Sequence, residues 1–240
     1  MLKNSKIQIL LILSLGIVLF LAGCVDTSVN PIPSSLNYRS QVKVVNFATG
    51  VASATIKLQD KSGSVTSFGA VAYGAENGGG FKDIPAGNKT LLFNNGESYK
   101  LSADTDIKMR VFILGSSSDR RVAKLTERYI FQTKDSPNSE NLYPSDSAAV
   151  NFMNGSSDAS IDGFIATAQG GDTTVTFSAA LESGHAVSNV KLKAGSYDFY
   201  VLSAGDTLAT FKTVLGARSR YTAAVYGSST TLKGKVFKDD

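Results

Sequence analysis

Leu192–Leu202 reads LKAGSYDFYVL, which is typical of a tight turn followed by a half-buried β-strand. Every second residue from Tyr197 through Phe199 to Val201 is large and hydrophobic, whereas the residues between them are mixed. Side chains of a strand point alternately to its two faces, so this pattern predicts one face packed against a core. The stretch therefore favours an all-β fold.

Landmarks of this stretch recur in the first half of the chain, which indicates a duplication. The separation between matching landmarks grows slowly along the chain, as expected for two copies of one domain with small insertions. In chain order, the pairs are Asn46-Phe47 with Asn151-Phe152, IPAG (Ile84–Gly87) with LKAG (Leu192–Gly195), and Gly115 with Gly227.

Both copies carry the signals of a β-sandwich. In the first copy, alternate apolar residues run from Met109 to Ile113, and the charged Lys108 and Arg110 fall on the opposite face. Asn95-Gly96 is a strong hairpin signal because both residues can take a positive φ. Many short strands with regular turns predict two tandem immunoglobulin-like or transthyretin-like β-sandwich domains.

We place the first sandwich at residues 42–134 and the second at residues 147–240. Residues 135–146 are rich in Ser, Asn, Asp and Pro and are interpreted as a linker. Each copy has the usual size of a domain, so we expect each to bury its own core and fold alone, with little interface that depends on the linker. The alternative is one continuous sandwich whose strands exchange between the copies.

The N-terminus predicts secretion. Lys3 and Lys6 precede an apolar run, Ile7–Leu21, which is shorter than the roughly 20 residues that span a bilayer comfortably. We interpret residues 1–23 as a signal peptide and residues 24–41, which contain Pro31 and Pro33, as a tether. The alternative interpretation is an uncleaved N-terminal anchor helix.

Leu21, Ala22, Gly23 and Cys24 resemble the lipobox of bacterial lipoproteins. Cys24 is the only cysteine of the chain. The resemblance implies cleavage before Cys24 and acylation of its thiol with palmitate-like chains, which would hold the protein in the cell envelope. Val25 after the cysteine favours the outer membrane if the organism is Gram-negative. The predicted partner is thus a membrane, reached through lipid on Cys24.

The charge balance gives no support for nucleic-acid binding. Removing residues 1–23 takes two of the 24 basic side chains and none of the 20 acidic ones, so the remaining chain is nearly neutral. Proteins that bind nucleic acid usually carry a strong basic footprint. We therefore predict no nucleic-acid partner.

The pattern VNF, SSDASIDGFI, LKAGSYDFYVL and YTAAVYG in the second copy resembles the DUF4397 family of bacterial envelope domains. The matching positions are Val150-Asn151, Asp158-Ala159, Ala194–Tyr197 and Tyr221–Gly227. The first copy keeps Val45-Asn46 and Pro85–Gly87 but lacks the Asp-Ala step. The resemblance implies a sandwich in the envelope and no activity.

The sequence shows no catalytic, cofactor or metal constellation. His185 is the only histidine and is expected in a solvated loop, and no G-x-S-x-G elbow is present. Gly78–Gly80 is interpreted as an inter-strand loop rather than a phosphate cradle. Asp104 with Asp106, and Asp158 with Asp162, could ligate calcium, but no calcium-loop motif is present, and Asp104 and Asp158 are instead expected to satisfy turn amides. We predict that the protein is not an enzyme and has no cofactor.

Aromatic residues near predicted loops are candidates for stacking on sugars. They are Tyr73, Tyr143 and Tyr226, with Phe81 beside them, although aromatics of an all-β chain are mostly core residues. The predicted function is a non-enzymatic envelope lipoprotein that presents two sandwiches for binding or assembly with a glycan or an envelope protein. The alternatives are a carbohydrate-binding accessory module of a glycan-uptake system and, last, a hydrolase with an unrecognised site.

Overall fold

The computed structural model describes residues 38–132, 135–136, 143, 145–170 and 174–239. The chain from Tyr38 onward forms one compact unit. The signal peptide, the lipobox with Cys24 and nearly all of the tether lie outside the described residues. Within the described residues, no helix has the length and hydrophobicity needed to cross a membrane.

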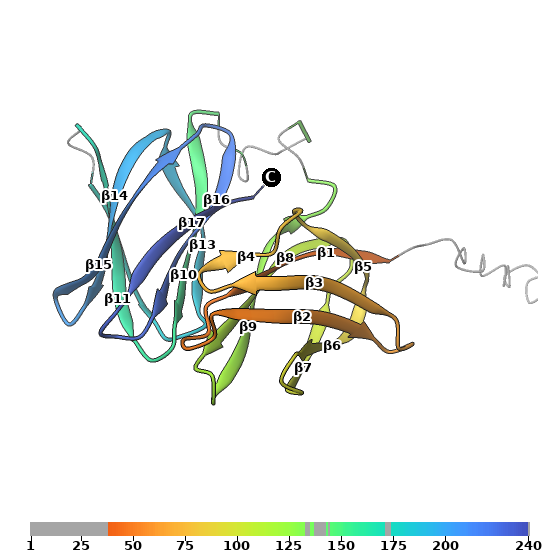
Figure 1. Cartoon of the computed structure of the whole chain (residues 1–240). Helices are drawn as coiled ribbons and strands as arrows, with labels where there is room; N and C mark the ends of the chain where they lie inside the picture. Colours follow the sequence, from red (N-terminus) through yellow and green to blue (C-terminus); the bar gives the residue numbers. More distant parts are fainter. Residues whose placement is uncertain (1–37, 133–134, 137–142, 144, 171–173, 240) are drawn as a thin grey trace, which may run out of the picture. The chain divides into compact units, whose positions relative to one another are not determined.

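The first body contains two sheets (Figure 1). One has the order β4-β1-β8-β9, with β5 also paired to β1, and the other has the order β3-β2-β6-β7. Strands β1 and β8 are parallel, and the other pairs are antiparallel. The strands are β1 (Arg39–Asn46), β2 (Ser53–Asp60), β3 (Val65–Ala72), β4 (Ala75–Glu76), β5 (Lys82–Pro85), β6 (Gly87–Phe93), β7 (Ser98–Ala103), β8 (Ile107–Gly115) and β9 (Arg120–Tyr129).

The second body repeats this topology with sheets β13-β10-β16-β17 and β12-β11-β14-β15. Strands β10 and β16 form its parallel pair. The strands are β10 (Ser147–Ser156), β11 (Ile161–Ala168), β12 (Thr174–Leu181), β13 (Ala186–Lys193), β14 (Gly195–Ser203), β15 (Asp206–Leu215), β16 (Ser219–Gly227) and β17 (Lys233–Lys238). The predicted all-β fold with two sandwich-like bodies is therefore confirmed, and the strand-exchange alternative is wrong because each body is built from its own consecutive strands.

Each body buries its own core, as the alternating pattern predicts. Tyr197, Phe199 and Val201 are all buried in the second core. Met109 and Ile113 are buried in the first core. Every second side chain of these strands faces the opposing sheet of the same body, which is how burial of apolar area stabilises a sandwich.

The hairpin predicted at Asn95-Gly96 forms, but only Gly96 takes a positive φ, so the expectation of a positive φ at both residues is wrong. Between β6 and β7, the Gly96 amide donates to the Phe93 carbonyl at 3.2 Å, with Gly96 at a φ of 86°. Between β14 and β15, Ala204 and Gly205 both have positive φ, as a two-residue hairpin turn requires. Gly78–Gly80 lies in the loop that separates β4 from β5 and is held by the Asn77 side chain, whose amide group donates to the carbonyl of Gly80 at 3.0 Å. The corresponding strand of the second body, β13, is unbroken.

The duplication is confirmed in its topology, but one aligned pair is wrong. Asn46 corresponds to Asn154 and not to Asn151. Both asparagines make the same three hydrogen bonds. The side-chain NH2 group donates to two carbonyls, one five residues later and one at the end of β3 or β12. The side-chain oxygen accepts the backbone amide two residues later. The bonds are Asn46 to Val51, Val71 and Ala48, and Asn154 to Ala159, Leu181 and Ser156.

The strand registers give the same correspondence. Val44 of β1 is paired with Val111 of β8, and Phe152 of β10 is paired with Ala223 of β16. Val44 and Phe152 are therefore equivalent, and they are separated by the same number of residues as Gly87 and Gly195. Equivalent residues of β8 and β16 are separated by slightly more. The match of Asn46-Phe47 to Asn151-Phe152 was a chance similarity within one strand.

Candidate functional site: the buried contact between the two bodies

The face of the β1-β8 sheet that points away from its own core is also buried. Every residue of β8 and of β10 is buried, although only alternate residues can face the core of each body. The sequence correctly placed Lys108 and Arg110 on the face opposite Met109. It gave no indication that this face would be covered. The residues that cover it come from the second body and from the loop of the first body that carries Phe81.

Apolar side chains of both bodies share one cluster at this contact. It contains Val45, Phe47, Phe112, Leu114 and Leu125 from the first body and Met153, Ala224 and Phe237 from the second. The ring of Phe47 stacks on Tyr226, with centroids 4.5 Å apart and planes 6° apart. The two sandwiches are therefore joined by a hydrophobic layer as well as by the chain.

The contact has an approximate two-fold relation between equivalent residues. Tyr226 of the second body packs on Gly74 of the first. The equivalent residues make the reciprocal contact, because Leu114 of the first body packs on Gly184 of the second. The apolar cluster contains further equivalent pairs, each with one member from each body: Val45 with Met153, Phe112 with Ala224, and Leu125 with Phe237. Isologous contacts of this kind are usual between identical subunits, and here they occur within one chain.

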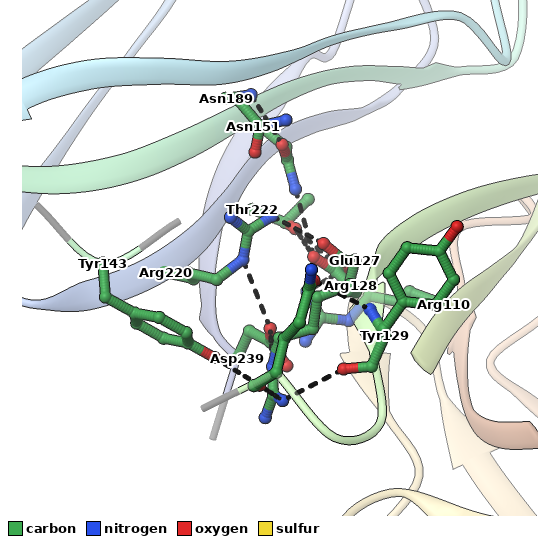
Figure 2. Close-up of polar contacts among 11 residues, drawn as sticks. Arg110, Glu127, Arg128, Tyr129, Tyr143, Asn151, Asn189, Arg220, Thr222 and Asp239 are labelled. Atoms are coloured by element: carbon green, nitrogen blue, oxygen red, sulfur yellow. Dashed lines mark hydrogen bonds and ion pairs between the residues drawn. The ribbon is translucent and has the colours of Figure 1, made fainter. Parts of the chain in front are cut away.

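Glu127 lies at the centre of the polar part of the contact (Figure 2). It is the extra residue of a β-bulge, because Met109 is paired with Thr126 and Lys108 with Arg128. A bulge turns a side chain away from its regular direction. The Glu127 carboxylate is completely buried and forms an ion pair with Arg110 at 3.1 Å, and Arg110 is also completely buried.

Residues of the second body satisfy the remaining acceptors of Glu127. Asn151 donates its side-chain amide to Glu127 Oε2 at 3.0 Å, and the Thr222 hydroxyl donates to Oε1 at 3.0 Å. Arg220 Nη2 donates to the backbone carbonyl of Glu127 at 2.6 Å. These three contacts cross from one body to the other, so a single side chain and its carbonyl connect β9 with β10 and β16.

Asp239 provides a second buried carboxylate next to the C-terminus. Arg128 Nε of the first body donates to Asp239 Oδ2 at 3.3 Å, and Arg220 Nε lies 3.6 Å from the same oxygen. Asp239 is the counterpart of Glu127 in the second body and lies on the strand extension that follows β17. The two equivalent acids therefore lie in one polar cluster, with arginines of both bodies around them.

The Arg110 guanidinium is placed between two aromatic rings. Its central carbon lies 5.2 Å from the centroid of Phe237 and 5.9 Å from that of Phe81. Lys43 Nζ and Lys108 Nζ each lie 4.9 Å from the centroid of Phe81. Cation–π contacts of this kind offset some of the desolvation of buried cations.

Burial raises the pKa of the Glu127 carboxyl, because the charged form loses its hydration. The ion pair with Arg110 acts in the opposite direction, and the nearby Asp239 carboxylate adds to the rise. The side chains of the cluster form ion pairs and hydrogen bonds with one another across the contact between the two bodies. We call this contact the joint.

The three tyrosines predicted as ligand contacts are not brought together as one platform. Tyr73 and Tyr226 meet edge to face, with centroids 5.4 Å apart, and both are half-buried at the contact between the bodies. Tyr143 is only 6% exposed and lies under Arg128, whose guanidinium carbon is 5.8 Å from the ring centroid. Glycan binding by these residues remains a prediction.

The other candidate residues occupy turns and surface pairs. His185 is exposed in the turn between β12 and β13. Asp158 accepts the backbone amide of Ser229 at 2.7 Å, as a turn-capping acid does. Asp104 instead pairs with Lys124 at 2.8 Å. Within the described ranges, acids, cysteines and histidines do not gather in groups of three or more that could hold a metal.

No protein-family model and no curated protein matches the sequence. Among solved structures, the Bacillus anthracis TIE protein is 10% identical over 82% of this chain and 34% of its own, with a TM-score of 0.26. A C-terminal fragment of the pilus adhesin SpaC from Lactobacillus rhamnosus GG is 14% identical over 84% of this chain and 87% of its own, with a TM-score of 0.21. This chain spans about a third of the length of the TIE protein. None of these likenesses supports an inference about the function of this chain.

Proposed function

We propose that this chain is a non-enzymatic, lipid-anchored protein of the cell envelope in which two DUF4397-like sandwiches act as one rigid unit for binding or assembly. The observation that supports the rigid unit is the set of buried bonds from Glu127 to Asn151, Thr222 and Arg220. Flexible tandem domains rarely bury charged side chains between them, because each charge would need its partner in every orientation. The lipid anchor rests on the lipobox-like Leu21–Cys24.

A rigid joint suits a protein that has to present a surface at a fixed place relative to its anchor. Two bodies that tumbled freely would lose orientational freedom on binding, whereas a preformed unit avoids that cost. The contact between the bodies also uses the Phe47 and Tyr226 rings, which leaves the far sheets β3-β2-β6-β7 and β12-β11-β14-β15 on the outside of this joint. We propose that these outer sheets and their loops face the partner.

Substitution of the acceptor cysteine tests the anchor. In cells fed an alkyne analogue of palmitate, the wild-type protein should carry the label and float with membranes. Cys24→Ala should stay at the precursor size and carry no label, whereas Ser28→Ala in the tether should behave as wild type. A Cys24→Ala protein of mature size that still floats with membranes would exclude the lipoprotein proposal.

A further inference from the structure

Three exposed aromatic side chains lie at one end of the first body. The exposed fractions are 53% for Tyr38, 47% for Tyr129 and 67% for Phe131. The rings of Tyr129 and Phe131 stack, with centroids 5.4 Å apart and planes 20° apart. The other two large hydrophobic side chains exposed to this degree in the described chain, Val65 and Val214, lie on β3 and β15. The exposed aromatic side chains are therefore gathered at this one end of the first body, which we call the aromatic end.

Backbone bonds place the three aromatics at the same end of one sheet. The Asp106 amide donates to the Arg39 carbonyl at 2.7 Å, and the Ile130 amide donates to the Asp106 carbonyl at 2.6 Å. The start of β1, the start of β8 and the end of β9 therefore meet around Asp106. Tyr38 precedes β1 directly, so this is also the end at which the chain from Cys24 enters the first body.

The length of chain before Tyr38 restricts how far this end can lie from the anchor. Only the short segment from Cys24 to Asn37 precedes Tyr38 after the predicted cleavage. Fully extended, such a segment spans at most about 50 Å, and an ordinary flexible chain spans much less. Of all the surfaces of the two bodies, the aromatic end is the one joined most directly to Cys24.

We propose that the aromatic end, formed by Tyr38, Tyr129 and Phe131, rests on the phospholipid bilayer that holds the anchor. Tyrosine and phenylalanine suit the boundary between headgroups and acyl chains, since a ring can enter the apolar layer while a hydroxyl stays hydrated. Arg39, exposed beside Tyr38, can meet lipid phosphates. The proposal builds on the lipid anchor of the proposed function and adds the orientation of the first body at the membrane.

The composition of the chain allows a test that does not depend on cellular lipidation. The chain contains no tryptophan and one cysteine. Residues 24–240 can therefore be coupled through the Cys24 thiol to a maleimide-headgroup lipid in phosphatidylcholine vesicles, with Phe131→Trp as the only indole. Val214→Trp, at a site that is equally exposed on β15 of the second body, is the matched control.

The readout is tryptophan emission with and without phosphatidylcholine brominated along its acyl chains. Phe131→Trp should shift to shorter wavelength on coupling and lose intensity with brominated lipid, while Val214→Trp should change in neither respect. Unquenched Phe131→Trp emission, or equal quenching at both positions, would overturn the proposal. Because the thiol is coupled chemically, this result is separate from the labelling experiment on Cys24→Ala in cells.

Discussion

Phe47 and Gly155 hold equivalent positions in the two bodies and contact each other across the joint. A Cβ atom added to Gly155 would lie 2.5 Å from Phe47 Cδ2 and 2.8 Å from the Val225 carbonyl oxygen. The approximate two-fold relation between the bodies therefore passes close to this pair. Only one of two equivalent residues can be large there, because two rings cannot occupy the same space, and this explains why the copies differ at this position.

Gly155→Ala should destabilise the protein by about 1–3 kcal/mol, the usual range for forcing a methyl group into a filled site. The measurement is the urea midpoint of unfolding. In the double variant Phe47→Ala/Gly155→Ala, the added methyl group no longer meets the ring. The losses of unfolding free energy in the two single variants should therefore sum to more than the loss in the double variant. Additive losses would show that the two residues do not interact.

Glu127→Ala should cost about 3–5 kcal/mol, because it removes one partner from a buried ion pair and leaves Arg110 without its closest carboxylate. Glu97→Ala, at the partly exposed pair with Arg120, is the control and should cost about 0–1 kcal/mol. Amide nitrogen relaxation gives a second readout. In the wild type, both bodies should have the same rotational correlation time. In Glu127→Ala, the correlation times of the first and the second body should differ. Similar costs for both variants would contradict the central place of Glu127.

The pH dependence of stability should carry the sign of the Glu127 shift. Burial raises the pKa of Glu127 above its ordinary value of 4.5, so the folded state binds a proton more readily than the unfolded state. The Glu127 contribution should therefore become more favourable as pH falls from the raised folded pKa towards 4.5, and it is lost as pH rises through that folded pKa. Below about 3.8, the lowered pKa of Asp104, caused mainly by its bond with Lys124, acts in the opposite direction.

Thermal unfolding of wild type and Glu127→Gln, measured from neutral pH to below about 3.8, separates the effect of Glu127 from that of Asp104. The stability difference between them should change between neutral pH and pH 4.5, since the glutamine amide does not titrate. The acid-side loss due to Asp104 should remain in both proteins. A difference that is constant over the whole window would show that the pKa of Glu127 is not raised in the folded protein.

The sequence predicted the sandwiches well, because periodicity and turn chemistry are local. Tyr197, Phe199 and Val201 alternate with more polar residues, and Gly96 supplies the positive φ of a hairpin loop, within a few residues of chain. The correspondence of Asn46 with Asn154 was missed because Asn151 offers the same letter slightly earlier in the strand. The hydrogen bonds of the two amides to carbonyls at the ends of β3 and β12, together with the strand registers, distinguish these candidates.

The joint could not be predicted from the sequence for a similar reason. Arg110 and Glu127 have the pattern of charges on a solvated strand face, and the chain covers them with residues that come much later, such as Asn151 and Asp239. Neither local pattern nor composition indicates which sheet face of one body meets the other. The one available signal was the duplication itself, since equivalent faces of two copies can form an isologous contact.

The separated copies provide the last test of how much the joint contributes. Residues 38–134 contain β1 to β9 and residues 147–240 contain β10 to β17, so each fragment has its own sheets and core and should fold cooperatively with a β-type far-ultraviolet signal. Each fragment exposes the apolar cluster around Phe47 or Phe237, and it should be less stable than the full chain. Mixing the fragments should restore the contact, which titration calorimetry and proton–nitrogen spectra can follow. Introducing Glu127→Ala into the first fragment should weaken this association while leaving its own spectrum dispersed. Fragments that show dispersed spectra but do not bind each other would mean that the contact needs the linker, whereas collapsed spectra for both would mean that neither sandwich folds without the joint.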